Sequence, residues 1–469
     1  MLLRRFYDPK LAQASYLVGC TRSGEALVVD PNRDIDPYLQ AADAEGLKVA
    51  HVTETHIHAD FVSGARELAH RAGARLYLSD AGGSDWRYAY SDGSTTLLRD
   101  GSCFRVGTVE VRARHVPGHT PEHLTFLVTD TAVASEPMGA FTGDFIFVGD
   151  VGRPDLIERT VRVRGSMEDS ARELFWSLQR FRELPDYLQI WPGHGAGSVC
   201  GKAPGAVPQS TLGYEKRFNW AFGIGDESRF VRAVLDGQPE PPRYFAEMKR
   251  INQAGPRLLG GLRRPARLPI GALVTALSQG AKVVDTRQAS EFMLGAVPGT
   301  LSIPVSKTFT TWAGSLLPYD GDFYLIVDDQ TVEELVRDLA GIGLDRIAGY
   351  FCTDTTEAWR TSQGHLQTIP TLTLADVSTQ LKRSNPIVLD VRSEGEWKSG
   401  HVPGSLNLPL GSLDQRMDEI PDARPLIVHC QTGARAAMAA SLLRARGFED
   451  VRLFLGGFAE WRASGREEK

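Results

Sequence analysis

The chain has 469 residues, of which 42% are apolar and 23% charged, and its formal net charge is −6 at pH 7. This length exceeds one ordinary domain and predicts two to four domains, with the composition of a soluble globular protein. The charge gives no indication of nucleic-acid binding, and no apolar run is long enough to cross a membrane. Five scattered cysteines without CxxC spacing argue against a disulfide framework and predict a cytoplasmic protein with one or two functional thiols.

The N-terminal part alternates between strand-like and helical patterns. Apolar runs at 15–20 and 25–30 are separated by a turn at 22–24. A helical stretch at 38–46 then leads to a further apolar run at 48–52. This order predicts a layered α/β domain.

A group of polar residues follows the last of these strands directly. The segment reads Thr-His-Ile-His-Ala-Asp-Phe, with His56, His58 and Asp60 at alternating positions. Imidazole and carboxylate groups that converge past a strand end suit first-row metals such as zinc and iron. Short motifs of this kind also occur as ordinary surface residues, so later segments must supply the remaining ligands.

Three later segments supply such residues. His119 lies in a Pro-Gly turn after the alternating strand 109–114, and Asp144 follows an apolar strand end. His194 lies in a second Pro-Gly turn. Loops at one edge of a sheet can converge, so these side chains are expected to form a metal site.

The motifs HIHAD, PGHT, TGD and PGHG, in this order, resemble the metallo-β-lactamase superfamily over about the first 200 residues. The resemblance implies an αβ/βα sandwich with a metal site at one edge. Two-metal members usually carry HxHxDH, but here the last position is Phe61, which has no donor atom. A single metal is therefore favoured.

The single-metal pattern resembles the persulfide dioxygenase branch of that superfamily. The resemblance implies one Fe(II) held by His56, His119 and Asp144, with zinc as the alternative metal. His58, Asp60 and His194 would then orient these ligands, or would be polar residues satisfied by their neighbours.

Other residues are weaker candidates. Arg153, Tyr214 and Arg217 are candidates for binding the substrate, because an arginine near the metal could pair with a glutathione carboxylate. A solvated surface charge is the alternative for Arg217. Cys200 follows His194 by six positions and is a candidate sulfur carrier, or else a buried small residue.

The C-terminal half contains an internal repeat after a turn-rich break at 236–242. The sequence Val-Asp-Thr-Arg at 284–287 recurs as Leu-Asp-Val-Arg at 389–392, and a Glu, Gly, Pro, Gly and Pro recur at the same spacing of 105 positions (390 − 285). We therefore expect a metal domain at 1–235, a linker at 236–264, and two copies of the repeated domain at 265–368 and 369–469.

The second copy carries a thiol loop. The buried strand 426–429 leads to Cys430, and Arg435 closes the loop before a strong helix former. Converging backbone N–H groups, the helix N-terminus and Arg435 would stabilise a thiolate. With its DVR opening and GHVPGS turn, residues 370–465 resemble the rhodanese family. A loop of six positions favours sulfur transfer over the longer loop of related phosphatases.

The first copy lacks this chemistry. Aligning its strand 324–327 with the second copy's strand places Asp329 opposite Cys430 and Glu334 opposite Arg435. A carboxylate cannot carry a persulfide and would repel anions, so this copy is expected to be inactive. Cys352 lies past the loop and is expected to be structural.

Taken together, the chain resembles a persulfide dioxygenase–rhodanese fusion of bacterial sulfide detoxification. The resemblance implies that glutathione persulfide or a similar persulfide is oxidised by O2 to sulfite, and that Cys430 exchanges sulfur among thiosulfate, sulfite and thiols. One alternative is a two-zinc thioester hydrolase of the glyoxalase II type, which Phe61 disfavours. Another is a sulfur-relay protein that does not oxidise. No nucleic-acid or membrane partner is expected, and a homo-oligomer is compatible with the sequence.

Overall fold

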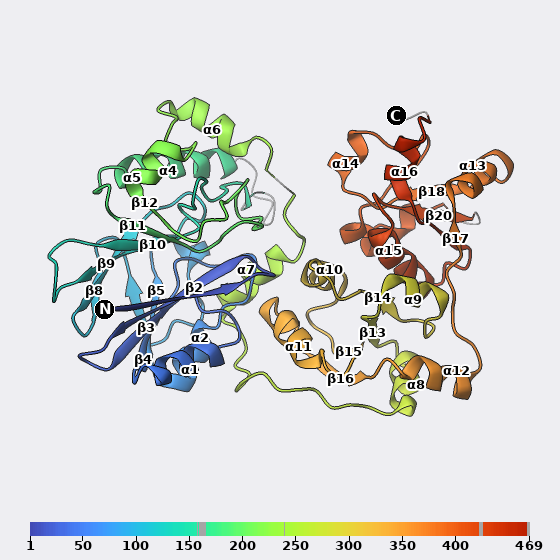
Figure 1. Cartoon of the computed structure of the whole chain (residues 1–469), viewed down its shortest axis with the longest axis horizontal. Helices are drawn as coiled ribbons and strands as arrows, with labels where there is room; N and C mark the ends of the chain where they lie inside the picture. The colour runs from blue at the N-terminus through green and yellow to red at the C-terminus, as the bar shows by residue number, and fades with distance from the viewer. Residues whose placement is uncertain (157, 159–165, 239, 422–424, 467–469) are drawn as a thin grey trace. The chain divides into compact units, whose positions relative to one another are not determined.

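The structure is a computed structural model that describes the chain except residues 157, 159–165, 239, 422–424 and 467–469. The chain forms two compact units (Figure 1). One comprises Met1–Leu262 with Ala340–Gly343, and the other comprises Arg263–Leu339 with Leu344–Lys469. Among the described residues, every helix is too short or too polar to span a lipid bilayer.

The first unit contains two six-stranded sheets. The strands of the first sheet, in spatial order, are β1 (Leu2–Asp8), β2 (Gln13–Cys20), β3 (Glu25–Val29), β4 (Lys48–Thr53), β5 (Arg75–Ser79) and β6 (Thr96–Leu98). Those of the second are β12 (Ser210–Thr211), β11 (Gln189–Pro192), β10 (Gly139–Gly143), β9 (Leu124–Asp130), β8 (Val109–His115) and β7 (Cys103–Val106). Strands β3 to β6 are parallel, as are β10 and β11, and the other pairs are antiparallel.

The inner faces of the two sheets share one apolar core. In β8 every second residue is buried, as the period of a strand requires when one face meets a core. Val109 and Val111 of this strand pack with Tyr16, Phe126 and Trp191 from other strands of the two sheets. Each such fully buried side chain contributes roughly 1.5–3 kcal/mol through the hydrophobic effect.

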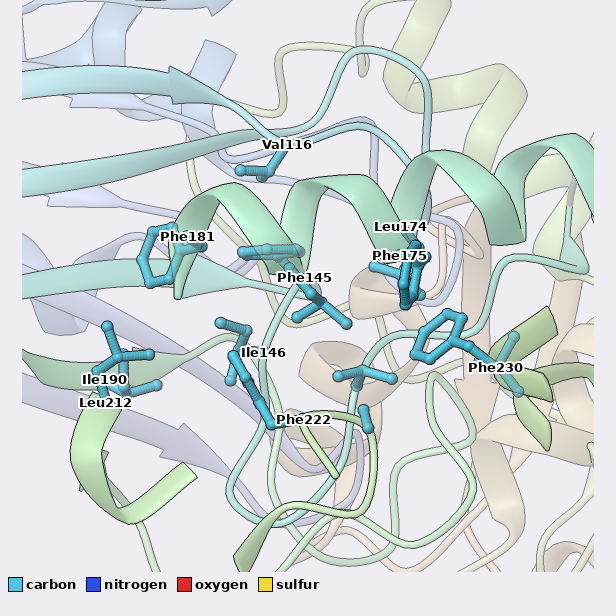
Figure 2. Close-up of a cluster of buried hydrophobic side chains, with 14 of the residues drawn as sticks. Val116, Phe145, Ile146, Leu174, Phe175, Phe181, Ile190, Leu212, Phe222 and Phe230 are labelled. Atoms are coloured by element: carbon cyan, nitrogen blue, oxygen red, sulfur yellow. The ribbon is translucent and has the colours of Figure 1, made fainter. Parts of the chain in front are cut away.

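Helices cover the outer faces. On the first sheet lie α1 (Asp36–Ala44) and α2 (Ala65–Ala72), and their apolar residues join that sheet's outer cluster. The outer cluster of the second sheet includes residues of α4 (Ser166–Phe181), α5 (Leu212–Phe218) and α6 (Glu227–Leu235). Figure 2 shows Phe175 and Phe181 of α4 in this cluster. The layers confirm the predicted αβ/βα sandwich.

The segment expected to be a linker, residues 236–264, contributes to the first unit. It contains α7 (Phe245–Ala254), and the first unit extends to Leu262. Asn252 of α7 is buried and donates to the carbonyl oxygens of His58 (2.8 Å) and Phe61 (2.7 Å). The helix α7 therefore supports the backbone of the first histidine motif.

The second unit contains two parallel sheets, which share the order of four strands, and the second sheet has a fifth strand at one edge. The first has the order β14 (Leu301–Ser302), β13 (Lys282–Asp285), β15 (Phe323–Ile326) and β16 (Ile347–Phe351). The second has the order β19 (Leu406–Asn407), β18 (Ile387–Asp390), β20 (Leu426–His429), β21 (Val451–Phe454) and β17 (Thr371–Leu372). The remaining elements are η1 (Ser84–Trp86) of the first unit and α8 (Ile270–Ser278), α9 (Ala289–Leu294), α10 (Phe309–Leu316), α11 (Val332–Gly341), α12 (Thr355–Gln363), α13 (Leu374–Arg383), α14 (Glu394–Lys398), η2 (Leu410–Gln415), η3 (Met417–Glu419), α15 (Ala434–Ala445) and α16 (Gly457–Ala463).

Each of the two sheets also carries an equivalent ion pair between an aspartate and an arginine, which we call the Asp–Arg clamp. In the first copy Arg287 Nη2 contacts Asp285 Oδ2 at 2.6 Å and donates to a glycine carbonyl eight residues on, at 3.0 Å. In the second, Arg392 makes the same bonds to Asp390 (2.7 Å) and to the corresponding glycine (2.8 Å). The repeat found in the sequence is therefore a repeat of structure.

Candidate metal site and thiol loop

The structure brings together the three residues predicted as metal ligands. His56 follows β4, His119 follows β8, and Asp144 follows β10. The Nε2 atoms of His56 and His119 lie 3.8 and 3.4 Å from Oδ2 of Asp144. One ligand atom from each residue lies within 4.8 Å of the others, and all three side chains are buried.

Two glycines allow this close approach of loops. Gly143, before Asp144, has a φ of +50°, and a Cβ there would lie 2.5 Å from the Thr55 hydroxyl. A Cβ on Gly152 would lie 1.7 Å from the Asp144 carbonyl oxygen. A side chain at either position would push the ligand loops apart.

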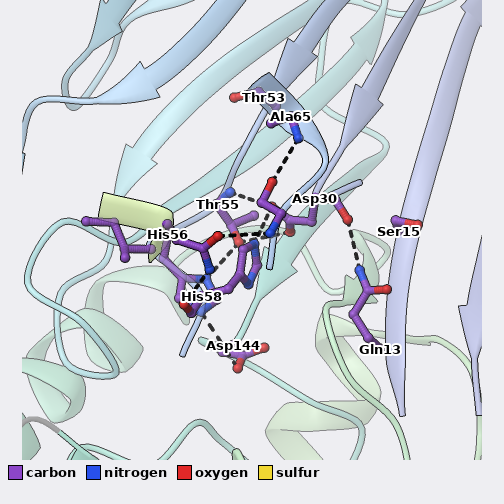
Figure 3. A network of polar contacts seen from close by, with 12 residues as sticks. Gln13, Ser15, Asp30, Thr53, Thr55, His56, His58, Ala65 and Asp144 are labelled. Carbon is purple, nitrogen blue, oxygen red and sulfur yellow. Dashed lines mark hydrogen bonds and ion pairs between the residues drawn. The ribbon is translucent and has the colours of Figure 1, made fainter. Parts of the chain in front are cut away.

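The second ring nitrogen of each candidate histidine ligand is anchored, and Figure 3 shows His56 beside Thr55 and Asp30. His56 Nδ1 is 2.9 Å from the Thr55 hydroxyl, which itself donates to Asp30 Oδ2 at 2.9 Å. His119 Nδ1 donates to the carbonyl oxygen of Arg153 at 3.0 Å. Both rings therefore carry their proton on Nδ1 and direct the Nε2 lone pair at Asp144, which is the arrangement that metal-binding histidines need.

The atoms that face the centre of this group need a partner. His56 Nε2 and Asp144 Oδ2 are buried and have no hydrogen-bond partner among the described residues. Burial, followed by the charges of neighbouring histidines, holds the pKa of His56 well below its usual range, and burial lowers that of His119. Neutral imidazoles and an ionised carboxylate fit a metal cation, which would satisfy the unpartnered atoms.

Asp30 supports this site, although the sequence analysis did not single it out. Its Oδ1 accepts from the backbone N–H of Thr55 at 2.7 Å and lies 3.2 Å from His58 Nε2. Its φ of +51° is a strained conformation for a residue other than glycine. The available signal was its place at the end of β3, the neighbour of β4 in the sheet.

The three residues expected to orient the ligands do contact them or their supports. His58 lies against Asp30 and packs its ring on Phe61, with 4.4 Å between centroids. His194 bridges two carboxylates, with Nδ1 2.6 Å from Asp144 Oδ1 and Nε2 2.7 Å from Asp60 Oδ2. Both nitrogens of His194 are thus engaged, and the Asp144 carboxylate is fixed by one of them.

Arg153, a candidate for binding substrate, is engaged within the fold. Its guanidinium is fully buried and forms a bidentate ion pair with Asp155, with both N–O distances at 2.7 Å. The charge of Arg153 is thus paired within the fold, and its role in binding substrate stays a prediction. The contribution of Arg153 is its carbonyl oxygen, which anchors His119.

Cys200 lies beside the site, as expected. Its sulfur is grouped with ligand atoms of Asp60 and His194 within 4.8 Å. Burial raises the pKa of this thiol well above its ordinary value, which disfavours the thiolate. Its role as a sulfur carrier stays a prediction.

Tyr214 and Arg217 are exposed on α5. The ring of Tyr214 packs against Phe218, with 4.8 Å between centroids. Within the described part of the chain, no hydrogen bond, ion pair or ring contact joins either residue to the three ligands. Their role in binding substrate stays a prediction.

The thiol loop of the second copy has the predicted form. Cys430 follows β20, and its buried sulfur accepts a hydrogen bond from the backbone N–H of Gly433 at 3.1 Å, at the start of α15. Arg435 was expected to lend its charge to the thiolate. It instead forms a bidentate ion pair with Glu396, at 2.6 and 2.8 Å, so part of that charge is neutralised.

In the first copy, the carboxylate that stands at the thiol position is itself engaged in an ion pair and a hydrogen bond. Asp329 Oδ1 accepts from the Tyr350 hydroxyl at 2.5 Å and lies 2.8 Å from Arg264 Nη2. The Cys352 sulfur lies 3.9 Å from the same oxygen, so this cysteine adjoins the degenerate loop instead of lying apart from it. Burial raises the pKa of the Cys352 thiol.

Comparisons with known proteins agree with this division. Residues 8–194 match the family model of the metallo-β-lactamase superfamily, and residues 373–464 match that of the rhodanese-like domain. A crystal structure of a metallo-β-lactamase from Staphylococcus aureus is 42% identical, with a TM-score of 0.67, covering 75% of this chain and 99% of that one.

Several relatives match smaller shares of this chain. A probable metallo-hydrolase from Burkholderia pseudomallei is 31% identical over 288 residues, which are 55% of this chain and 94% of that protein. The mitochondrial persulfide dioxygenase of Homo sapiens is 28% identical over 197 residues, 41% of this chain and 68% of that protein. Two β-lactamase hydrolase-like proteins from Xylella fastidiosa are matched over only 64% of their own length.

The layered fold, the ligand geometry and these matches lead to one conclusion. The chain belongs to the metallo-β-lactamase superfamily and also contains a rhodanese-like domain.

Proposed function

We propose that the protein oxidises glutathione persulfide or a similar small persulfide with O2 at one Fe(II), and transfers sulfur through Cys430. The observation that carries the proposal is the set of two anchored histidines and one carboxylate, beside Phe61. Two histidines and a carboxylate leave coordination positions open, as oxygen-using Fe(II) sites require. The similarity to persulfide dioxygenases of Homo sapiens and Bos taurus supports the same choice.

The protein groups would hold the ion and keep its surroundings fixed. His56, His119 and Asp144 would bind it through Nε2, Nε2 and Oδ2, the atoms that face one another. Iron supplies the redox chemistry by which a persulfide, O2 and water yield a thiol and sulfite. His194 and Thr55 restrict the ligands to one orientation, because each bonds the atom of a ligand that faces away from the ion.

The rhodanese-like domain would move a sulfur atom by thiol exchange. The Cys430 thiolate attacks the outer sulfur of thiosulfate, the S–S bond breaks, and sulfite leaves with its electron pair. A small thiol then attacks the resulting Cys430 persulfide and restores the thiolate. The Gly433 N–H, 3.1 Å from the sulfur, would stabilise the anion in each resting state. The same steps reversed would produce thiosulfate from sulfite.

A thioester hydrolase is the second candidate, and one observation favours it. A hydroxyacylglutathione hydrolase from Methylococcus capsulatus is 34% identical over 179 residues, 38% of this chain and 60% of that protein. A two-metal hydrolase would need a further ligand where this chain has Phe61. Metal content separates the two proposals, because the dioxygenase requires one ion per chain and the hydrolase two.

The test is oxygen uptake by the iron-loaded full-length protein on addition of glutathione persulfide, with sulfite, thiosulfate and thioester hydrolysis measured in parallel. We expect H119A to abolish uptake and leave thiosulfate sulfurtransfer intact, and C430S to do the reverse. Bound iron without oxygen uptake would refute the dioxygenase and favour a sulfur relay. Two metals per chain with thioester hydrolysis would favour the hydrolase.

A further inference from the structure

His123 is a buried histidine beside the metal ligands that the motifs did not single out. It directly precedes β9 and is completely inaccessible to solvent. Its ring lies flat against that of His56, with 4.7 Å between centroids and 16° between planes. Its Nε2 accepts the backbone N–H of Asp144 at 3.1 Å. One side chain therefore contacts two of the three ligand residues.

The two contacts constrain different freedoms of the ligands. The stacked ring limits rotation of the His56 imidazole, which is also held by the bond from its Nδ1 to Thr55. The hydrogen bond holds the peptide that follows Gly143, which is the turn that presents the Asp144 carboxylate. A Cβ on Gly143 would lie 2.9 Å from His123 Nε2, so the turn and the ring are in direct contact.

The protonation pattern of His123 is not one that packing alone would select. Because Nε2 accepts a hydrogen bond, a neutral ring carries its proton on Nδ1. That nitrogen is buried and has no hydrogen-bond partner among the described residues. A phenylalanine would fill the same space without burying this group, but it could not accept the Asp144 N–H.

We infer that His123 is a positioning residue of the metal site, which sets the plane of His56 and the turn of Asp144. The inference rests on the proposed metal binding and is independent of the reaction. Two substitutions separate its contacts. H123F keeps a stacked ring and removes the acceptor, whereas H123Q provides an amide oxygen as acceptor and removes the ring.

The test measures Fe²⁺ affinity of the full-length protein by anaerobic chelator competition, together with thermal unfolding of the metal-free protein. Substitution of a group that orients metal ligands typically weakens metal affinity about 10–100-fold. We therefore expect a loss of Fe²⁺ affinity of about that size in H123F and a smaller loss in H123Q. We also expect the visible spectrum of the Co²⁺-loaded protein to change in both. H51F is the matched control, because His51 also packs on aromatic rings, Tyr77 and Phe104, within the same unit.

Weaker Fe²⁺ binding with an unchanged unfolding midpoint of the metal-free protein supports the inference. Wild-type affinity and an unchanged Co²⁺ spectrum in H123F overturn it. If H123F does not fold, H123Q decides by the same two measurements. A protein whose Fe²⁺ affinity depends on His123 as described, but which consumes no oxygen, would refute the proposed function alone.

Discussion

The link from His56 through Thr55 to Asp30 can be broken with a single nearly isosteric change, T55V. The Thr55 hydroxyl is buried, donates to Asp30 Oδ2 and accepts from His56 Nδ1, both at 2.9 Å. Valine preserves the β-branched shape and removes both bonds. The backbone N–H of residue 55 keeps its 2.7 Å bond to Asp30, so the loop retains one attachment.

The magnitude follows from the groups left unpaired. A hydrogen bond to a charged group contributes about 1.5–3 kcal/mol, and a buried donor left without a partner costs about 1–3 kcal/mol. We therefore expect T55V to lower the free energy of unfolding of the metal-free protein by about 2–4 kcal/mol. With His56 no longer held in one tautomer and orientation, metal affinity should fall by about 10–100-fold.

The chain offers a matched control in T125V. The Thr125 hydroxyl in β9 is also fully buried, but it has no hydrogen-bond partner among the described residues. The same substitution there removes no bond and should be neutral or slightly stabilising. Both variants are measured by denaturant unfolding without metal and by chelator competition with Fe²⁺. If the free energies of unfolding of T55V and T125V agree within about 0.5 kcal/mol and the two variants bind Fe²⁺ equally, the link from His56 through Thr55 to Asp30 does not act as described.

Two further predictions concern the second unit. The hydrogen bonds from Arg435 lower the pKa of Glu396 to about 2, so the stabilisation by this pair is complete above the ordinary pKa of a glutamate and is lost as pH falls from about 4.5 toward 2. The midpoint temperature of thermal unfolding should therefore fall less steeply between pH 5 and 2 in E396Q than in the wild type. Identical pH profiles of the two midpoints would contradict this. In a C430S background, D329C should give no thiosulfate sulfurtransfer, because Arg264 and Tyr350 occupy the loop; measurable transfer would show that the missing thiol is the only defect.

The sequence was sufficient to predict that the three candidate metal ligands lie close together. His56, His119 and Asp144 each follow a strand, and loops at the same edge of stacked sheets meet in space. Their supporting contacts could not be predicted in the same way. Asp30 and His123 act through backbone N–H groups and ring faces, which depend on tertiary distances and have no fixed spacing in the chain.

Charge was the least predictable property of individual residues. An arginine near a metal motif indicates an anion site only if its own neighbours leave it unpaired. Arg153 is followed two residues later by Asp155, and the ion pair between them removes its charge from the site. Arg435 is paired with Glu396, 39 residues away, a contact that only the folded domain creates. Cys352 likewise lies close to Asp329 because it directly follows β16, which ends near the degenerate loop.

The Asp–Arg clamp predicts how mutations will be tolerated across the duplicated half. Asp285 and Asp390 are fully buried in their clamps, so removing either arginine would strand a carboxylate in its core. In the loops, by contrast, only the second copy has the thiol, Cys430, that the proposed sulfur transfer requires. Substitutions at the clamp should therefore be harmful in both copies, whereas substitutions in the loop should be harmful in the second copy alone. A survey of variants would reveal which parts of a duplicated gene remain under selection for folding after selection for chemistry has ended.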